Sequence, residues 1–85
     1  MRLLETAKFA RLRKRLQDEE ERDALRTAVS EILSDPLAGK KLKGELGHLR
    51  SYRFTVRGQA RRVVYHFEVD TVILFSFGPR QGISK

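Results

Sequence analysis

Residues 50 to 77 read Arg50-Ser-Tyr-Arg-Phe-Thr-Val-Arg57, Gly58-Gln-Ala60, Arg61-Arg-Val-Val-Tyr-His-Phe67, Glu68-Val-Asp70 and Thr71-Val-Ile-Leu-Phe-Ser-Phe77. Three runs rich in Val, Ile, Thr, Tyr and Phe are separated here by two short segments that contain Gly58 and Asp70. β-Branched and aromatic residues favour strands, whereas Gly and Asp favour turns. The stretch therefore predicts three antiparallel strands joined by short turns.

Alternation along these strands divides their side chains between two faces of a sheet. In the first strand, one face is expected to carry Tyr52, Phe54 and Val56, and the other Arg53, Thr55 and Arg57. In the second strand, one face carries Arg61, Val63, Tyr65 and Phe67, and the other Arg62, Val64, His66 and Glu68. In the third strand, one face carries Thr71, Ile73, Phe75 and Phe77, and the other Val72, Leu74 and Ser76. Packed helices can bury only one face, so we expect Arg53 and Arg62 on the open face or its rim. A bulge near Gly58 is the alternative that would exchange the faces.

Two amphipathic helices are predicted before the strands. Thr6 is a good N-cap for a first helix over residues 7 to 17, in which Phe9, Leu12 and Leu16 fall at helical spacing. Asp18 can cap a second helix, with Glu21 completing a capping box. Its apolar stripe ends before Pro36, because the residue before a proline leaves the helical region; the stripe comprises Leu25, Ala28, Val29, Ile32 and Leu33.

The rest of the chain extends this framework. Residues 1 to 5 can form an edge strand, and residues 37 to 49 are expected to be a loop that Leu42, Leu46 and Leu49 hold against the core. We therefore predict one α+β domain over residues 1–85, in which an N-terminal helical hairpin packs on one face of a twisted, mostly antiparallel sheet of three or four strands.

Positive charge is concentrated in the second half of the chain. The net charge is +7 at pH 7. Residues 1 to 39 hold eight Lys/Arg and eight Asp/Glu, whereas residues 40 to 85 hold ten Lys/Arg and three Asp/Glu, so the second part carries the whole excess. A basic surface confined to one substructure favours nucleic acid or an acidic protein as the partner over simple solubility.

Composition argues against several other classes of protein. The chain has no cysteine and only two histidines, which argues against a disulfide framework and a structural metal, and we expect no cofactor. No apolar run reaches the length of a membrane span, and the N-terminus lacks the apolar core of a signal peptide. We therefore expect a cytoplasmic protein with no membrane partner.

Short motifs occur in a characteristic order after the helices. They are Lys41-Leu42-Lys43-Gly44, then Arg62-Val63-Val64-Tyr65 and then Gly78-Pro79-Arg80. This order resembles the RelE/ParE superfamily of toxins from bacterial and archaeal toxin–antitoxin pairs: the three motifs look like the family's K-L-x-G, Y-R-V-x-Y and G-x-R. Arg61 stands where the family more often has an aromatic residue. The resemblance covers nearly the whole chain.

The resemblance implies the toxin of a type II pair, foremost an mRNA interferase that cuts messenger RNA on the ribosome. In that reaction the ribose 2′-OH attacks the adjacent phosphate. Carried over residue by residue, Arg62 and Arg80 match family positions that stabilise the phosphate or donate a proton, and Arg53 is a third basic candidate. Guanidinium groups suit this role because they present two parallel donors to a phosphate. No metal ion is implied.

One departure from the family keeps other functions open. Many family interferases carry Tyr or His a few residues after the G-x-R arginine, where this chain has Ser84, which is too weakly acidic to replace that ring easily. Either His66 or His48 takes the part, or the activity is weak, or the protein does not cleave RNA. The alternatives are a ParE-like inhibitor of DNA gyrase and an inactive module that only binds its antitoxin.

Further basic residues are expected to contact RNA, and an acidic antitoxin is expected to cover the basic face. The candidates for RNA contact on the ribosome are Lys40, Lys41, Lys43, Arg50, Arg57 and Arg61. Lysines such as Lys40, Lys41 and Lys43 most often form only a solvated surface, and it is their closeness to the sheet that makes RNA contact an option for them. Electrostatic complementarity would make association with either partner fast and sensitive to salt.

Overall fold

Five strands and two α-helices make up the computed structural model of the chain, which describes residues 1–79. In chain order the elements are β1 (Arg2–Glu5), α1 (Ala7–Arg15), α2 (Glu19–Ser34), β2 (Lys40–Lys41), a 3-10 helix (Gly44–Leu46), β3 (Arg50–Val56), β4 (Gln59–Glu68) and β5 (Thr71–Pro79). The strands form one sheet in the order β1-β5-β4-β3-β2. All neighbours are antiparallel except β1 and β5, which are parallel.

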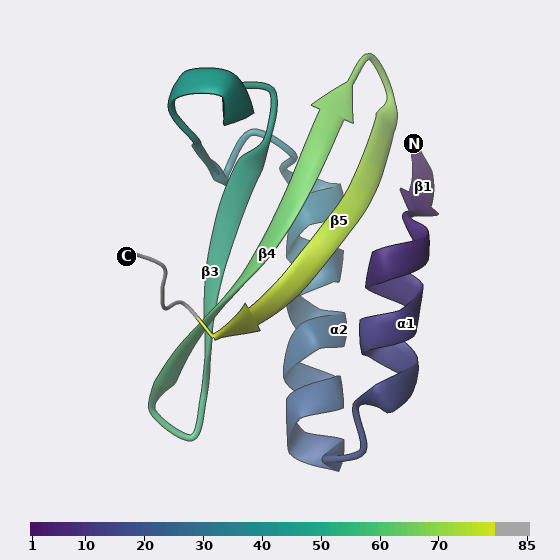
Figure 1. Ribbon diagram of the computed structural model, residues 1–85, viewed down its shortest axis with the longest axis vertical. Helices are drawn as coiled ribbons and strands as arrows, with labels where there is room; N and C mark the ends of the chain where they lie inside the picture. The colour runs from purple at the N-terminus through teal and green to yellow at the C-terminus, as the bar shows by residue number, and fades with distance from the viewer. Residues whose placement is uncertain (80–85) are drawn as a thin grey trace.

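Both helices pack on one face of this sheet and leave the other face open (Figure 1). Thr6 caps α1 as predicted, since its hydroxyl accepts a hydrogen bond from the Phe9 amide at 3.2 Å. The α1 helix ends at Arg15 rather than at residue 17, because Leu16 adopts an extended conformation. Asp18 caps α2 through the Glu20 amide at 3.1 Å. The predicted α+β domain, with a helical hairpin packed on one face of the sheet, is therefore confirmed.

The sheet is wider than the expected three or four strands. Residues 2 to 5 form the edge strand that the sequence allowed, and two residues of the expected loop, Lys40 and Lys41, pair with Ser51 and Arg50 as the opposite edge. Two residues are too short a run to carry a periodic signal. The expectation that Leu46 holds this segment against the core is wrong, because Leu46 is 52% exposed, whereas Leu49 is buried.

The core forms between the helices and the covered face of the sheet. Its buried members are Phe9, Leu25, Ala28, Ile32, Val63, Tyr65, Val72 and Leu74. Val56 on β3 is also buried, as the alternation in the first two strands predicts. Burying apolar surface is the dominant favourable contribution to folding, so this layer holds the hairpin on the sheet.

A bulge in β5 overturns the predicted faces of the third strand. Val64 pairs with Ser76, but the next residue, Tyr65, pairs with Leu74, which leaves Phe75 as an extra residue on β5. An extra residue exchanges the two faces beyond it. Val72 and Leu74 therefore face the helices on one side of the bulge, and on the other side Phe77 packs against Phe9 with ring centroids 5.1 Å apart. The expected grouping of Phe75 with Phe77 is wrong.

Candidate nucleic-acid interface

Arg53 and Arg62 lie opposite each other on adjacent strands. They are paired positions in the antiparallel ladder of β3 and β4, so their side chains leave the same face. That face is the open one, because Val63, the neighbour of Arg62, is fully buried on the helix side. Within residues 1–79, neither guanidinium has a hydrogen bond or an ion pair with a side chain. Two like charges in direct opposition destabilise a sheet slightly, which suggests a use other than folding.

A basic groove lies next to this arginine pair. It encloses about 320 Å³ and is lined by Lys40, Lys41, Leu42, Lys43, Ser51, Arg53, Arg61 and Arg62. The three lysines come from β2 and the residues after it, and the three arginines from β3 and β4. None of the described residues that line it is acidic. The groove therefore concentrates positive potential and is suited to bind phosphate groups.

A buried tyrosine and an arginine fix the segment that carries the groove's lysines. The Tyr65 hydroxyl donates to the Pro36 carbonyl at 2.6 Å and accepts from the Gly39 amide at 3.0 Å. Arg50 donates to the Gly39 carbonyl at 2.8 Å. A Cβ on Gly39 would lie 2.5 Å from the Tyr65 hydroxyl, so only glycine fits there. We call Tyr65, Arg50 and Gly39 the β2 clamp, because Lys40 follows directly.

Two of the expected RNA-binding arginines are engaged with α2 instead. Arg61 forms an ion pair of 2.9 Å with Glu21, in which both side chains are largely buried, at 16% and 22% exposure. The capping box expected between Asp18 and Glu21 is therefore not formed: Glu21 binds Arg61 on the sheet, and Asp18 alone caps α2. The chain turns at Arg57, where φ is 52°, and Arg57 binds Asp18 at 2.5 and 2.9 Å. Hydrogen bonds from Arg57 lower the pKa of the Asp18 carboxyl.

The structure therefore brings most, but not all, of the described basic candidates together. Lys40, Lys41, Lys43, Arg53 and Arg62 come together at the basic groove. Arg61 lines the same groove from its ion pair with Glu21. Arg50 and Arg57 make contacts within the protein, the first to the turn before β2 and the second to the start of α2.

The histidines lie apart from the basic groove, on the same open face. His66 is four residues along β4 from Arg62, which corresponds to about 13 Å. Both its ring nitrogens are occupied, Nδ1 by the His48 carbonyl at 2.7 Å and Nε2 by Glu68 at 3.1 Å. These two contacts raise the pKa of His66. The rings of His48 and His66 also meet edge to face.

Two further candidates, Arg80 and Ser84, lie outside the described residues. Over residues 1–79 no group of three or more His, Cys, Asp or Glu is placed to hold a metal ion. In the same part of the chain, no helix has the length and apolar character needed to cross a membrane.

Sequence reasoning did not identify the β2 clamp. The alternation of β4 assigned Tyr65 to the core, which is correct, but gave no sign that its hydroxyl binds a turn 26 residues earlier. The sequence predicts an RNA contact for Arg50, since nothing in its local sequence indicates that it donates a hydrogen bond to the Gly39 carbonyl. A glycine directly before a lysine pair is the one available signal, since it permits a close approach.

Comparison with known proteins gives a consistent result. The family model described as the ParE-like toxin of type II bacterial toxin–antitoxin systems matches residues 3–84. No curated protein matches the chain.

Solved structures share the fold at low sequence identity. A YoeB/ParE toxin from Agrobacterium tumefaciens is 18% identical, with a TM-score of 0.79 over 95% of this chain and 100% of that one. The RelBE2 toxin–antitoxin complex of Mycobacterium tuberculosis contains a chain that is 24% identical, with a TM-score of 0.73 over 93% and 96%. The intact RelBE complex of Escherichia coli contains a chain that is 21% identical, with a TM-score of 0.73 over 95% and 98%.

Proposed function

The chain belongs to the ParE-like toxins of type II bacterial toxin–antitoxin systems, and from this premise we propose that it is a toxin that cleaves messenger RNA on the ribosome and is held in check by an acidic antitoxin. The observation that carries the proposal is the arginine pair of Arg53 and Arg62 beside the basic groove. The solved complexes from Mycobacterium tuberculosis and Escherichia coli are themselves toxin–antitoxin complexes, which supports a protein antitoxin as the partner.

The proposed reaction is attack of the ribose 2′-oxygen on the neighbouring phosphorus. The 2′-hydroxyl loses its proton to a base, the bond from phosphorus to the 5′-oxygen breaks, and the leaving oxygen takes up a proton. The products are a 2′,3′-cyclic phosphate and a free 5′-hydroxyl. Negative charge builds on the non-bridging oxygens during the attack, so preorganised cations on that phosphate accelerate the step.

Arg53 and Arg62 are assigned to that charge. They face each other on rigid neighbouring strands, where Cα atoms are about 4.5–5.5 Å apart, so two guanidinium groups can reach one phosphate. A preorganised donor of this kind is worth about 3–4 kcal/mol in the transition state. We assign Lys40, Lys41 and Lys43 to the flanking phosphates of the RNA strand, because they line the same groove.

A second candidate function follows from what the described lining of the groove lacks. Its members include no histidine, tyrosine or carboxylate, which are the commonest proton-transfer groups. The charged groups that line the groove are all cations, and cations can hold phosphates without breaking a bond. This composition favours a toxin that binds its target without cutting RNA, such as an inhibitor of DNA gyrase.

One experiment separates these functions. The protein is induced in cells, RNA 5′ ends are mapped, and plasmid supercoiling is measured in parallel. New 5′-hydroxyl ends within translated messages support RNA cleavage, and their absence together with altered supercoiling supports the gyrase alternative. The Arg62→Ala variant is the control, because its loss of the effect ties the effect to the basic groove.

A further inference from the structure

The two histidines of the chain lie ring against ring on the open face of the sheet. Their ring centroids are 5.8 Å apart, and the ring planes meet at 64°. His66 belongs to β4, and His48 lies in the loop that leads into β3. We call these two rings the histidine pair. Neither ring lines the basic groove, so the cleavage step proposed above leaves both unused.

Hydrogen bonds hold the His66 ring in place and use both of its nitrogens. Nδ1 contacts the His48 carbonyl at 2.7 Å, and Nε2 contacts the Glu68 carboxylate at 3.1 Å. Both partners are acceptors, so both contacts are hydrogen bonds when the ring carries two protons. A ring held in this way keeps no N–H for a phosphate. What it offers to a ligand is the surface of a fixed, flat ring.

His48 presents the more accessible ring of the pair. His48 is exposed, whereas the His66 side chain keeps 23% of its surface. The backbone of His48 is fixed on both sides, since its carbonyl binds His66 and the next residue, Leu49, is buried. Within residues 1–79, the His48 ring itself has no hydrogen bond or ion pair. An exposed aromatic ring on a fixed backbone is suited to stack on a nucleobase.

Small side chains separate the histidine pair from the arginine pair. Val64 lies midway between Arg62 and His66 on β4, and alternation puts all three on the same face. The cross-strand partners of Val64 are Ser51 on β3 and Ser76 on β5. Ser51 also lines the basic groove, so this low row is continuous with the groove. A strand of a few nucleotides can therefore pass over it from one pair to the other.

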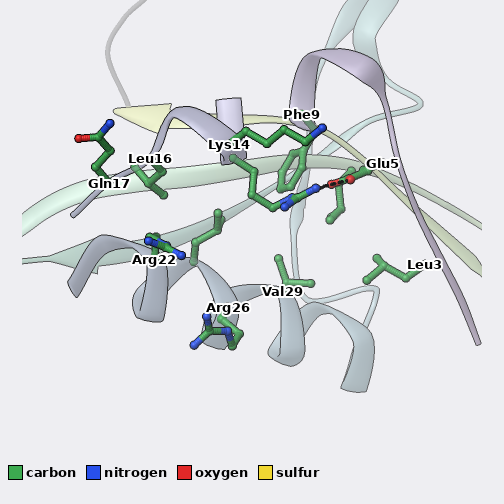
Figure 2. Close-up of a pocket in the computed structure, with 12 residues that line it drawn as sticks. Leu3, Glu5, Phe9, Lys14, Leu16, Gln17, Arg22, Arg26 and Val29 are labelled. Atoms are coloured by element: carbon green, nitrogen blue, oxygen red, sulfur yellow. Dashed lines mark hydrogen bonds and ion pairs between the residues drawn. The ribbon is translucent and has the colours of Figure 1, made fainter. Parts of the chain in front are cut away.

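The larger hollow of the molecule lies on the other side of the sheet. It encloses about 600 Å³ between the two helices and the strands β1 and β5 (Figure 2). Its lining includes Phe9 and Leu25, which belong to the core on the covered face. The sheet thus separates this hollow from Arg53 and Arg62. The base of a nucleotide next to a phosphate held by these arginines lies on the open face instead.

We propose that the histidine pair is a base-binding subsite, in which a nucleobase of the RNA strand stacks on the His48 ring while a phosphate of the same strand lies between Arg53 and Arg62. The inference rests on the proposed function, because that function places the phosphate. His66 is a positioning residue that holds His48 through its carbonyl. Stacking strength sets the base preference of such sites, so a purine, which has the larger ring system, is the expected base.

The subsite would determine which phosphate of the strand reaches the arginine pair. Stacking fixes one base at His48, and the length of the low row then fixes how many nucleotides separate that base from the bound phosphate. The position of cleavage relative to a purine would follow from this distance. The basic groove alone cannot supply such a preference, because phosphate contacts carry no direct sequence information.

The test uses a purine-containing RNA oligonucleotide of about five nucleotides, within the range that single-strand binding sites cover. Its 2′-hydroxyls are methylated, so that the proposed attack cannot occur. In a series of oligonucleotides each base in turn is replaced by an abasic site. Affinity for the purified protein is measured by fluorescence anisotropy, and the ring protons of the two histidines are followed by NMR.

The expected result is that one base position stands out. Removing that base should weaken binding about fivefold or more, as expected for the loss of one stacked base. The intact oligonucleotide should shift the His48 ring protons upfield in a saturable way, and the oligonucleotide that lacks this base should not.

Variants of the loop give a matched comparison. His48→Ala should weaken binding of the intact oligonucleotide about fivefold or more, and in this variant removal of the same base should cost less than about twofold. His48→Phe keeps a flat ring and should restore binding. Leu46→Ala truncates a side chain of the same loop that is 52% exposed, and it should leave the affinity unchanged. Thermal melting shows whether each variant folds.

Several results would overturn the inference. They are equal affinity for all the abasic oligonucleotides, equal losses in His48→Ala and Leu46→Ala, binding by His48→Phe that is as weak as by His48→Ala, and tighter binding of a DNA oligonucleotide of the same sequence. Cleavage in a translating extract is measured separately. If the unmodified protein cuts no RNA while the base still stacks on His48, the proposed nuclease function falls and the subsite remains. Cleavage together with a flat abasic series removes the subsite alone.

Discussion

Arg53 and Arg62 face each other across β3 and β4, with no acidic partner for either among the described residues. Two neighbouring arginines do have such partners: Arg57 binds Asp18, and Arg61 binds Glu21. The contrast marks Arg53 and Arg62 as the pair whose charge the fold leaves uncompensated.

Replacing either of these two arginines should remove activity without harming the fold. For Arg62→Ala and Arg53→Ala we expect loss of RNA cleavage in a translating extract. Stability should stay the same or rise by about 0.2–1 kcal/mol, because a repulsive cross-strand pair is removed. Arg→Lys should restore only part of the cleavage, since an ammonium lacks the two-pronged geometry. Arg11→Ala, on the outer side of α1, is the control, and full cleavage by both Arg→Ala variants would remove the proposed site.

The lysines of the basic groove should account for part of the salt dependence of RNA binding. Binding to single-stranded RNA weakens with salt with a log–log slope of about −0.7 for each neutralised phosphate. Changing Lys40, Lys41 and Lys43 together to Ala should flatten the slope by up to about 2. The same charge is removed elsewhere by Lys8→Ala, Arg11→Ala and Arg15→Ala, for which the slope should not change. Equal slopes in the two triple variants would assign the groove lysines to solvation.

Loss of the Tyr65 hydroxyl should loosen the β2 clamp. Tyr65→Phe leaves the Gly39 amide and the Pro36 carbonyl without their partner in a buried site, which should lower the free energy of unfolding by about 1–3 kcal/mol. RNA binding should weaken too, because Lys40 and Lys41 follow the clamp. Tyr52→Phe removes a hydroxyl that binds exposed Glu31 and should cost less. If Tyr65→Phe does not weaken RNA binding further once Lys40, Lys41 and Lys43 are changed to Ala, the Tyr65 hydroxyl affects RNA binding through those lysines.

Protonation of His66 should stabilise the protein at acidic pH. Contacts to the His48 carbonyl and to Glu68 raise the pKa of His66 above its unfolded value of about 6.5. The stabilisation is therefore complete below that value and is lost as pH rises through the folded pKa. We expect the difference in melting temperature between the unmodified protein and His66→Gln to be largest below about pH 6 and to shrink at higher pH. A constant difference across this range would contradict the assignment.

Local patterns were sufficient to predict most of the framework. Thr6 and Asp18 marked the starts of both helices, and alternation placed Val56, Val63 and Tyr65 against them. These signals work because capping and burial act within a few residues. Arg53 and Arg62 followed from the same alternation.

Features that depend on distant partners could not be predicted. The bulge at Phe75 is visible only against the register of β4, so the alternation of β5 alone misassigned Phe77. Arg57 and Arg61 have the same local character as Arg62, and only the position of α2 brings Asp18 and Glu21 to them.

The parallel pairing of β1 with β5 has a consequence for when the protein becomes complete. The hydroxyl of Thr6 donates to the Phe75 carbonyl, 69 positions later in the chain. During synthesis the first strand must wait for almost every residue up to β5 to emerge before it has a neighbour. Pairing across such a separation is slow, because the intervening chain must be ordered first. A protein whose proposed target is the ribosome would thus mature only after the part of the chain through β5 has left the ribosome that makes it.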